Sequence, residues 1–477
     1  MNHIGIIGGG FSGIVTAVNL SRLSTGPLRI SIVNAGYPLG RGVAYSTRNS
    51  NHLLNVAARN MSALADQPAH FLEWLLTRSE YYEESVARLR EKFVPRRVYG
   101  DYLHGLFYSQ TCSAAEKGVS IETISAEATD IVPKSGGASV ALSNGQSFEA
   151  TRVVLATGNP APPNLKLQGL DPAHPKCFQN PWSDWQSKLK DLTENVILVG
   201  TGLTAIDATI SLQDLGWKGK IFAISRNGLL PLSHFKGMEY PEWLDGKADK
   251  ITLREALRAF ERNYRNAEAQ GVNPAILVDK LRPITQQIWQ NFSLADKKRF
   301  NRHFRTRWNV VRHRIAQSIH QQLLESMSFH RLEIVKGRLT EASEYGDQIV
   351  VTVKTGGSFR RIEGGALINC TGPSESCSRS QSPLYANLLS RGLVQPDEMD
   401  MGIKVSPEYA AMDKSGKSSG FLYALGPVLK GSLWESSAVP ELRSQAFRLA
   451  EILAKQLYGK SSVGLAEAAE VVHEYEI

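Results

Sequence analysis

The hydrophobic pattern at the start of the chain alternates between two periods. Residues 3–7 form a short apolar run, and apolar residues then recur at helical spacing from Ile14 to Leu23. A second apolar run follows at residues 29–33. Short apolar runs of this length are typical of buried strands, and the spacing between them is typical of an amphipathic helix. The pattern therefore predicts a strand, a helix and a parallel strand, which together make a βαβ unit.

A glycine-rich turn joins the first predicted strand to the helix. Gly8, Gly10 and Gly13 fit the pattern G-x-G-x-x-G. In a dinucleotide-binding unit the first glycine makes the tight turn, the second lets the backbone approach a pyrophosphate, and the third packs helix on strand. The helix N-terminus then offers N–H donors and a positive dipole to the phosphates. A plain glycine-rich turn is the alternative, but the flanking strands and helix favour a dinucleotide site.

The end of the second predicted strand departs from this pattern. An acidic residue there usually binds the ribose hydroxyls, but this chain has Asn34. Asn34 still offers an amide for a ribose hydrogen bond. Arg41 lies in the glycine-containing loop that follows and is a candidate for a cofactor contact.

A second unit of the same kind is predicted in mid-chain. Val196–Val199 is an apolar run, and Gly200, Gly202 and Ala205 follow it at the same spacing. Alanine is permitted at the third position. The strand after the helix ends in Arg226, where an acid would favour NAD, so an arginine pairing with a 2′-phosphate favours NADPH. The alternative for Arg226 is a solvated charge at a strand end.

Two further strands end alike and suggest how the chain is divided. Residues 153–155 and 366–369 each run into a Thr-Gly pair, and they flank the second unit. We interpret them as crossings between two nucleotide domains, although a buried strand followed by a turn explains each of them locally. The predicted fold is α/β with two Rossmann-like domains. In flavoproteins with two nucleotide domains, segments similar to these mark the crossings between the FAD and NADP domains. That resemblance implies an FAD-binding domain at 1–160 and 366–477, into which an NADPH-binding domain at 190–365 is inserted.

Residues 241–330 have few glycines and long helical patterns, and they predict a helical insert. Eight Lys and Arg residues lie between residues 297 and 314. Phe300, Phe304 and Trp308 recur every fourth position among them, which predicts one helix with an apolar stripe and a solvated cationic face. A gate for an anionic substrate and a surface for the NADPH phosphates are the alternatives.

The C-terminal region predicts a second approach to a cofactor. Phe421–Leu425 reads as a strand, and Gly426 opens the loop that follows it. Pro440 and Glu441 are typical of a helix start. Trp434, within that loop, either packs beside a flavin ring or belongs to the core.

The composition excludes several protein classes. The 477 residues are 42% hydrophobic and carry a net charge of +8, which fits a globular chain with two or three cores. Nucleic-acid binding is not expected, because no recognition module accompanies the charge. No apolar run is long enough to span a membrane. The four cysteines and the absence of a visible leader predict a cytoplasmic protein.

The segments that carry a family resemblance spread over most of the chain. They are GRGVAYST (Gly40–Thr47), HLLNVAARNMSA (His52–Ala63), GTGLTAID (Gly200–Asp207), SRNGLLP (Ser225–Pro231), RHR (Arg312–Arg314), NCTGP (Asn369–Pro373) and GSLWESSAVPELR (Gly431–Arg443). With these segments the chain resembles two-dinucleotide-binding flavoproteins, and within them a bacterial FAD/NAD(P)-binding family. Through PRRVYGDYL (Pro95–Leu103) it is also similar to single-component flavin-dependent N-hydroxylating monooxygenases, and members resembling the nitrosuccinate-forming aspartate N-hydroxylases fall near this family.

This resemblance implies an activity and its cofactors. FAD reduced by NADPH would react with O2 to a flavin C4a-(hydro)peroxide, which hydroxylates the nitrogen of a small amine or amino acid. The resemblance implies that Asn55 lies near the flavin edge as the catalytic candidate, and a turn cap is its alternative role. The helix after Pro440 would point its N-terminus at the flavin.

Two other functions stay open at this point. One is an NAD(P)H:acceptor oxidoreductase or an oxidase that inserts no oxygen, and the other is a non-enzymatic FAD/NADPH-binding sensor. A dithiol reductase is not expected, because the four cysteines form no C-x-x-C pair. No metal site is expected either, since His and acidic residues do not cluster at ligand spacing. Assembly into a homo-oligomer also stays open.

Overall fold

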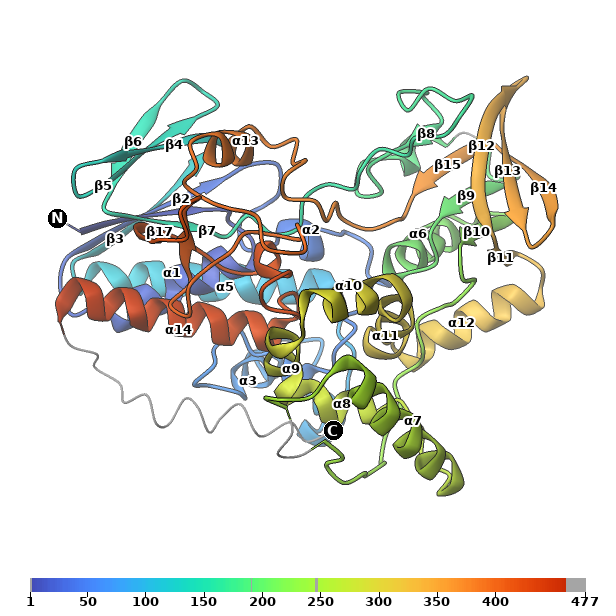
Figure 1. The fold of residues 1–477 in the computed structure, drawn as a ribbon, viewed down its shortest axis with the longest axis horizontal. Coiled ribbons are helices and arrows are strands. Elements are labelled where there is room, and N and C mark those ends of the chain that lie inside the picture. Colours follow the sequence, from blue (N-terminus) through green and yellow to red (C-terminus); the bar gives the residue numbers. More distant parts are fainter. Residues whose placement is uncertain (1, 190, 245–247, 460–477) are drawn as a thin grey trace.

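The computed structural model describes residues 2–189, 191–244 and 248–459. Two sheets, one mainly and one wholly parallel, lie side by side along the long axis of the molecule, with a group of helices below and between them (Figure 1). The predicted α/β fold with two nucleotide-binding-like units and a helical region is confirmed. The exact boundaries predicted for the domains stay a prediction, and residues 190, 245–247 and 460–477 of those ranges lie outside the described residues.

The first sheet combines the two ends of the chain. Its strand order is β16-β17-β7-β1-β2-β3, with β1 in the middle and its Ile4 and Ile6 fully buried. All pairs are parallel except β16 with β17. The strands are β1 (Asn2–Ile7), β2 (Leu28–Asn34), β3 (Val119–Ser125), β7 (Arg152–Leu155), β16 (Ala410–Met412) and β17 (Ser418–Ala424).

Different layers cover the two faces of this sheet. Helices α1 (Phe11–Leu23), α5 (Arg96–Ala115) and α14 (Val439–Tyr458) pack on one face (Figure 1). A small antiparallel sheet covers the other and is built from β4 (Ala128–Lys134), β5 (Gly137–Leu142) and β6 (Ser147–Ala150). Its Phe148 approaches Gly5, which leaves room for the ring. One continuous apolar core joins these layers.

The second sheet is wholly parallel, in the order β11-β10-β9-β15-β8. Its strands are β8 (Cys177–Phe178), β9 (Val196–Val199), β10 (Ile221–Ser225), β11 (Leu332–Lys336) and β15 (Ala366–Asn369). Helices α6 (Leu203–Asp214) and α12 (Gln317–Ser328) cover one face. The other face is covered by β12 (Arg338–Tyr345), β13 (Gln348–Thr355) and β14 (Ser358–Gly364). Strand β8 shows that residues before 190 contribute to this unit.

The helical region has its own apolar core, which contains Trp289 and Trp434. Its helices are α7 (Leu253–Ala269), α8 (Ile276–Leu281), α9 (Thr285–Asn291), α10 (Leu294–His303) and α11 (Arg305–Arg312). The prediction of one helix across residues 297–314 is wrong, because α10 ends and α11 begins on either side of Phe304. All three stripe aromatics still pack on this core, and the break turns Arg305 toward Glu375.

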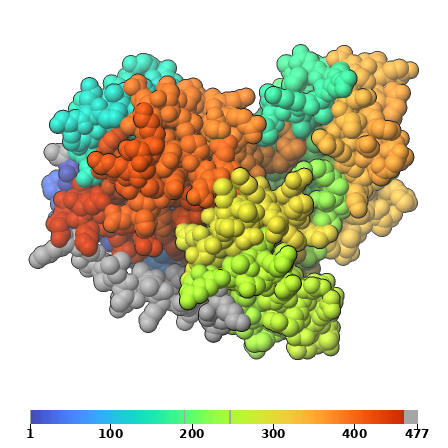
Figure 2. Space-filling view, in the orientation of Figure 1, coloured from blue at the N-terminus to red at the C-terminus, as the bar shows by residue number. Residues whose placement is uncertain are grey.

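The remaining helices are short. They are α2 (Gly42–Tyr45), α3 (His70–Leu76), α4 (Val86–Arg90) and α13 (Pro383–Ser390), with single 3₁₀ turns at 58–60, 186–188, 282–284 and 427–429. Within the described residues, no helix combines the length and apolar character needed to cross a bilayer. Figure 2 shows the bodies built on the two sheets separated by a notch above the helical region.

Candidate functional site

The first glycine-rich turn is crowded at two of its three glycines. A Cβ on Gly8 would lie 2.3 Å from the backbone oxygen of Ala156, and the residue has a φ of +113°. A Cβ on Gly13 would lie 1.9 Å from the oxygen of Gly8. Gly8 is therefore required where β1 ends against the segment after β7, and Gly13 where α1 packs on the turn.

The middle glycine faces open space. A Cβ on Gly10 would meet only the Cα of Gly42, at 3.7 Å, and Gly42 in turn approaches the Cα of Gly10. Gly10 is also the N-cap of α1, and no side chain caps that helix. The free N–H groups of the first turn thus point into a cradle that any larger side chain would fill. Uncapped helix N-termini of this kind are where proteins bind phosphate groups, so the pyrophosphate contact of Gly10 stays a prediction.

The second turn repeats the first. A Cβ on Gly200 would lie 2.4 Å from the oxygen of Cys370, just as Gly8 meets Ala156. A Cβ on Gly202, the N-cap of α6, would meet no described atom within 4 Å, and no side chain caps this helix. Ala205 is buried on α6, where its methyl group packs in the core. Both units therefore hold the same open cradle at the carboxyl edge of a parallel sheet.

The three side chains predicted to contact a cofactor near the strand ends differ in the bonds that they already make within the protein. Asn34, at the end of β2, donates its amide to the Tyr37 carbonyl at 2.9 Å, so it also closes a local turn. Arg226, directly after β10, is exposed and forms no ion pair among the residues that the structure describes. Arg41 is already engaged, because it pairs with Asp101 and donates to the Arg97 carbonyl. The cofactor contacts predicted for all three stay predictions.

The C-terminal loop reaches the first turn. Gly426 has a φ of +85°, and a Cβ there would lie 3.1 Å from the Ser12 hydroxyl at the start of α1. Its N–H donates to the Gln445 side chain, and the Ser436 hydroxyl donates to its carbonyl. The loop between β17 and α14 is thus tied to α14 while it lies beside the cradle of Gly10.

Trp434 belongs to the core of the helical region. Its ring is 3% exposed and stacks on Trp289 with the centroids 4.5 Å apart. The Trp289 indole donates to the Gly431 carbonyl at 2.8 Å. These contacts favour the core interpretation of Trp434, and a flavin contact stays untested.

Buried charges fasten the same loop to the helical region. Glu435 accepts from the Trp308 indole at 2.8 Å and pairs with Arg312 at 3.1 Å. Arg312 also lies 3.6 Å from Glu441 in the first turn of α14. Burial lowers the pKa of the neighbouring His313 to about 4, so this histidine is neutral. The predicted solvated cationic face is therefore wrong for Arg312, and it is also wrong for Arg314, which is buried against Asp279.

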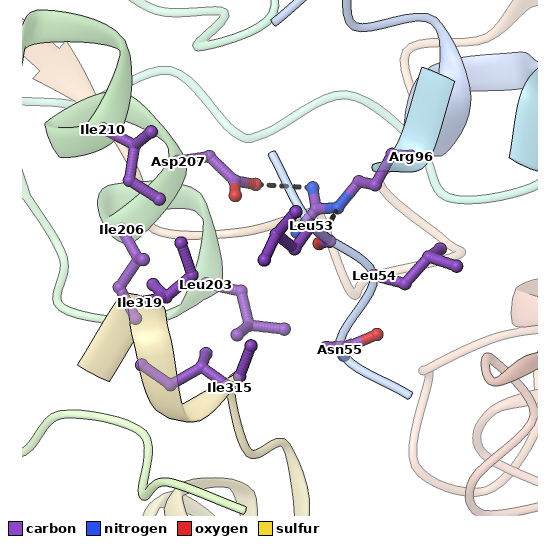
Figure 3. Close-up of a pocket in the computed structure, with 11 residues that line it drawn as sticks. Leu53, Leu54, Asn55, Arg96, Leu203, Ile206, Asp207, Ile210, Ile315 and Ile319 are labelled. Atoms are coloured by element: carbon purple, nitrogen blue, oxygen red, sulfur yellow. Dashed lines mark hydrogen bonds and ion pairs between the residues drawn. The ribbon is translucent and has the colours of Figure 1, made fainter. Parts of the chain in front are cut away.

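Asn55 lies on a seam between the two units. Its carbonyl accepts from His234 Nε2 at 3.0 Å, and its side chain forms no hydrogen bond within the described part of the chain. In Figure 3 its amide points away from Ile315 and Ile319. Within the described residues the Asn55 amide caps no turn, so the alternative role as a turn cap is not observed. The catalytic role of Asn55 stays a prediction.

The seam itself is polar and closely packed. Arg96 donates to Asp207 on α6 at 2.6 Å and to the Leu53 carbonyl at 3.0 Å (Figure 3). His52 donates from Nε2 to the Asp207 carbonyl at 2.9 Å, and burial lowers its pKa. The cavity lined by Arg96, Asp207 and apolar side chains that include Ile206 on α6 and Ile319 on α12 has a volume of about 20 Å³, which holds about one water molecule. The seam joins the two units, and its cavity is too small for a substrate.

A cationic cluster lies where the units and the helical region meet. Lys430, in the loop after β17, lies 3.1 Å from Glu375, in the segment after β15, and Arg305 also pairs with Glu375. The segments after β7 and β15 run side by side, since the Ser374 N–H donates to the Ala161 carbonyl at 3.1 Å. Lys430 and Glu375 are not among the residues predicted from the sequence, although each closely follows a Gly-Pro pair at a strand end.

The described ranges contain neither a metal site nor a disulfide. No group of three His, Cys, Asp or Glu side chains there is arranged to hold a metal ion. All four cysteines are free, and burial raises the pKa of the Cys370 thiol, which lies beside the second glycine turn.

A comparison with protein-family models finds a match within the first unit. Residues 5–160 match the family model described as FAD-NAD(P)-binding. The matched residues make up most of the N-terminal part of the first unit. A search of curated proteins finds no match.

Several solved structures share the fold of nearly the whole chain. A cadaverine monooxygenase of Erwinia amylovora, solved with FAD, matches with a TM-score of 0.63 and 14% identity over 96% of this chain and 94% of that one. The ornithine N-hydroxylase of Kutzneria sp. 744, solved with reduced FAD, NADP+ and L-ornithine, gives 0.61 and 15% over 95% and 99%. L-Lysine 6-monooxygenase of Pseudomonas syringae gives 0.59 and 16% over 96% and 98%. At these identities the likeness establishes the fold.

Proposed function

We propose that the protein is an FAD- and NADPH-dependent monooxygenase that hydroxylates the nitrogen of a small amine or amino acid. One observation carries the proposal. Two open glycine cradles lie at the carboxyl edges of two parallel sheets, and the loops beyond those edges meet at the Glu375–Lys430 contact. Ligands of parallel α/β sheets bind at this edge. The fold shared with N-hydroxylases supports the reaction class.

The residues present fit FAD in the first unit. Gly10 and Gly42 leave room for a pyrophosphate, and the uncapped N-terminus of α1 supplies the donors. The N-terminus of α14 and the loop from Gly426 lie beside that turn and would stabilise negative charge on a bound flavin. When bound, FAD supplies the redox chemistry, accepting a hydride from NADPH and reacting with O2.

The second unit fits the nicotinamide coenzyme. Gly202 and the uncapped N-terminus of α6 would hold its pyrophosphate, and Arg226 is free to pair with a 2′-phosphate. The polar seam at Arg96 and Asp207 fixes this unit against the first. We propose that Asn55, which lies on that seam, hydrogen-bonds the cofactor or the substrate between the units.

The proposed reaction is balanced by NADPH and O2. An amine, O2, NADPH and a proton give a hydroxylamine, water and NADP+. The protein needs little acid–base machinery for this, since the amine nitrogen is the nucleophile. The free cysteines and the demand for NADPH fit a location in the cytoplasm.

Anaerobic titration with NADPH tests the first half of this proposal. We expect one equivalent of NADPH to bleach the bound flavin, whereas a sensor would leave it oxidised. In air, a panel of amines and amino acids is then screened for substrate-dependent NADPH oxidation and for hydroxylamine product. Rapid oxidation that yields only peroxide or a reduced acceptor would identify the acceptor oxidoreductase or oxidase instead.

A further inference from the structure

The cluster of Lys430, Arg305 and Glu375 joins three parts of the molecule. Lys430 comes from the loop after β17 in the first sheet, and Glu375 from the segment after β15 in the second. Arg305 comes from the start of α11 and pairs with the same carboxylate. The cluster therefore lies at the carboxyl edges of both sheets, where bound ligands of both units would converge.

Positive charge exceeds negative charge in this cluster. Lys430 and Arg305 both pair with Glu375, so two cations share one carboxylate. Glu435 is nearby and its charge raises the pKa of Lys430, but Glu435 is itself ion-paired with Arg312 and accepts from Trp308. Burial lowers the pKa of Lys430 to about 8 and that of Arg305 to about 10, and in each case a neighbouring cation lowers it further. Such a site is costly without an anion to neutralise it.

The two cations of the cluster also lie against the ring of Trp434. The Lys430 ammonium and the Arg305 guanidinium lie 5.9 Å and 5.8 Å from the centroid of the Trp434 ring. Trp434 is itself held by Trp289. The two cations are thus fixed side by side, and the guanidinium offers the planar fork that suits a carboxylate.

We propose that Lys430 and Arg305 bind the carboxylate of the substrate, which makes the substrate an amino acid and excludes simple diamines. This inference rests on the proposed function. Glu375 occupies the position of that carboxylate until the substrate displaces it. Lys430 belongs to the loop that begins at Gly426, and Gly426 lies beside Ser12 at the start of α1 in the first unit. Arg226, at the end of β10, is left for the coenzyme phosphate.

Binding to the FAD-loaded protein with NADP+ present tests the proposal directly. The probes are three amino acids, each with a partner that lacks its carboxylates, together with succinate. The pairs are L-ornithine with putrescine, L-lysine with cadaverine, and L-aspartate with β-alaninamide. Affinity is measured by calorimetry and by the change in flavin absorbance, and hydroxylamine product by mass spectrometry.

Three variants separate this role from a structural one. Lys430→Met should weaken binding of the carboxylate probes about tenfold to a hundredfold and leave binding of the partners that lack a carboxylate unchanged. Lys430→Arg should restore much of the affinity. Glu375→Gln should tighten carboxylate binding, because it removes the internal competitor, and no purely structural role predicts a gain. Lys220→Met is the matched control, since Lys220 pairs with Glu333 at 2.5 Å far from the crevice.

Each alternative has its own outcome. If the cluster holds a coenzyme phosphate, Lys430→Met raises the KM for NADPH more than that for NADH and leaves the amino acids unaffected, which overturns the proposal. Equal affinity for each amino acid and its partner also overturns it, as does failure of all carboxylate probes to bind. If the protein hydroxylates diamines and Lys430→Met leaves that activity unchanged, this inference is refuted while the proposed function stands. Loss of the proposed function itself appears separately, as carboxylate binding without any hydroxylated product.

Discussion

The polar seam between the two units allows a quantitative test of what holds them together. The side chains of Arg96 and Asp207 are 14% and 7% exposed, and their charged atoms lie 2.6 Å apart. Asp207→Asn keeps the shape of this side chain and removes its charge. The amide oxygen of the variant can still accept from Arg96, and the Leu53 carbonyl still does, but the counter-charge of the guanidinium is gone. Breaking a buried pair in this way costs about 3 kcal/mol, because one charge stays buried without its counter-charge.

Urea denaturation followed by circular dichroism measures this loss as a lower transition midpoint at unchanged slope. Asp130→Asn is the control, because Asp130 pairs with Arg391 at the same 2.6 Å distance with the arginine 44% exposed. Such a surface pair contributes less than about 1 kcal/mol. In addition, Asp207→Asn should slow flavin reduction by NADPH while dithionite reduces the flavin normally. Equal, small effects of both variants on stability would refute the reasoning about the seam.

Three other predictions follow from the site. Gly10→Leu should abolish FAD binding and Gly202→Leu should abolish NADP+ binding, each with the other cofactor still bound, because both positions are open in the fold. Loss of circular dichroism in either variant would contradict the idea of an open cradle. Arg226→Ala should raise the KM for NADPH at least about tenfold more than that for NADH, and steady-state kinetics that change equally for the two coenzymes would remove the 2′-phosphate contact. Burial lowers the pKa of His313 from 6.5 to about 4, so the unfolded chain gains this proton first as the pH falls. Between pH 6.5 and 4 the fold therefore loses up to about 3 kcal/mol. His313→Gln should flatten that part of the stability profile measured in urea, and an unchanged profile would show that another group is responsible.

Local sequence patterns were sufficient to predict the two glycine-rich units. A turn that must bring β1 against the segment after β7 tolerates only glycine at Gly8, and the same requirement recurs at Gly200. These constraints act between residues that are close in sequence or that share a strand pattern. The predicted strands at residues 3–7 and 196–199 therefore lie within one residue of the observed ones.

The sequence pattern did not predict the contacts between segments that are distant in the chain. Arg312 looks like part of a solvated cationic helix until Glu435 and Glu441 are brought against it from the C-terminal loop and α14. The break at Phe304 likewise depends on packing in the helical region and on the pairing of Arg305. Long-range ion pairs of this kind follow from the tertiary arrangement, which helical periodicity does not encode.

Oxygen-isotope labelling tests the central proposal most directly. The FAD-loaded protein is supplied with NADPH, the amino acid that best stimulates NADPH oxidation, and ¹⁸O₂. We expect one ¹⁸O atom in each hydroxylamine product and one product molecule for each NADPH oxidised. Labelled peroxide in place of labelled product, at the same NADPH consumption, would contradict the proposal that this protein is a monooxygenase.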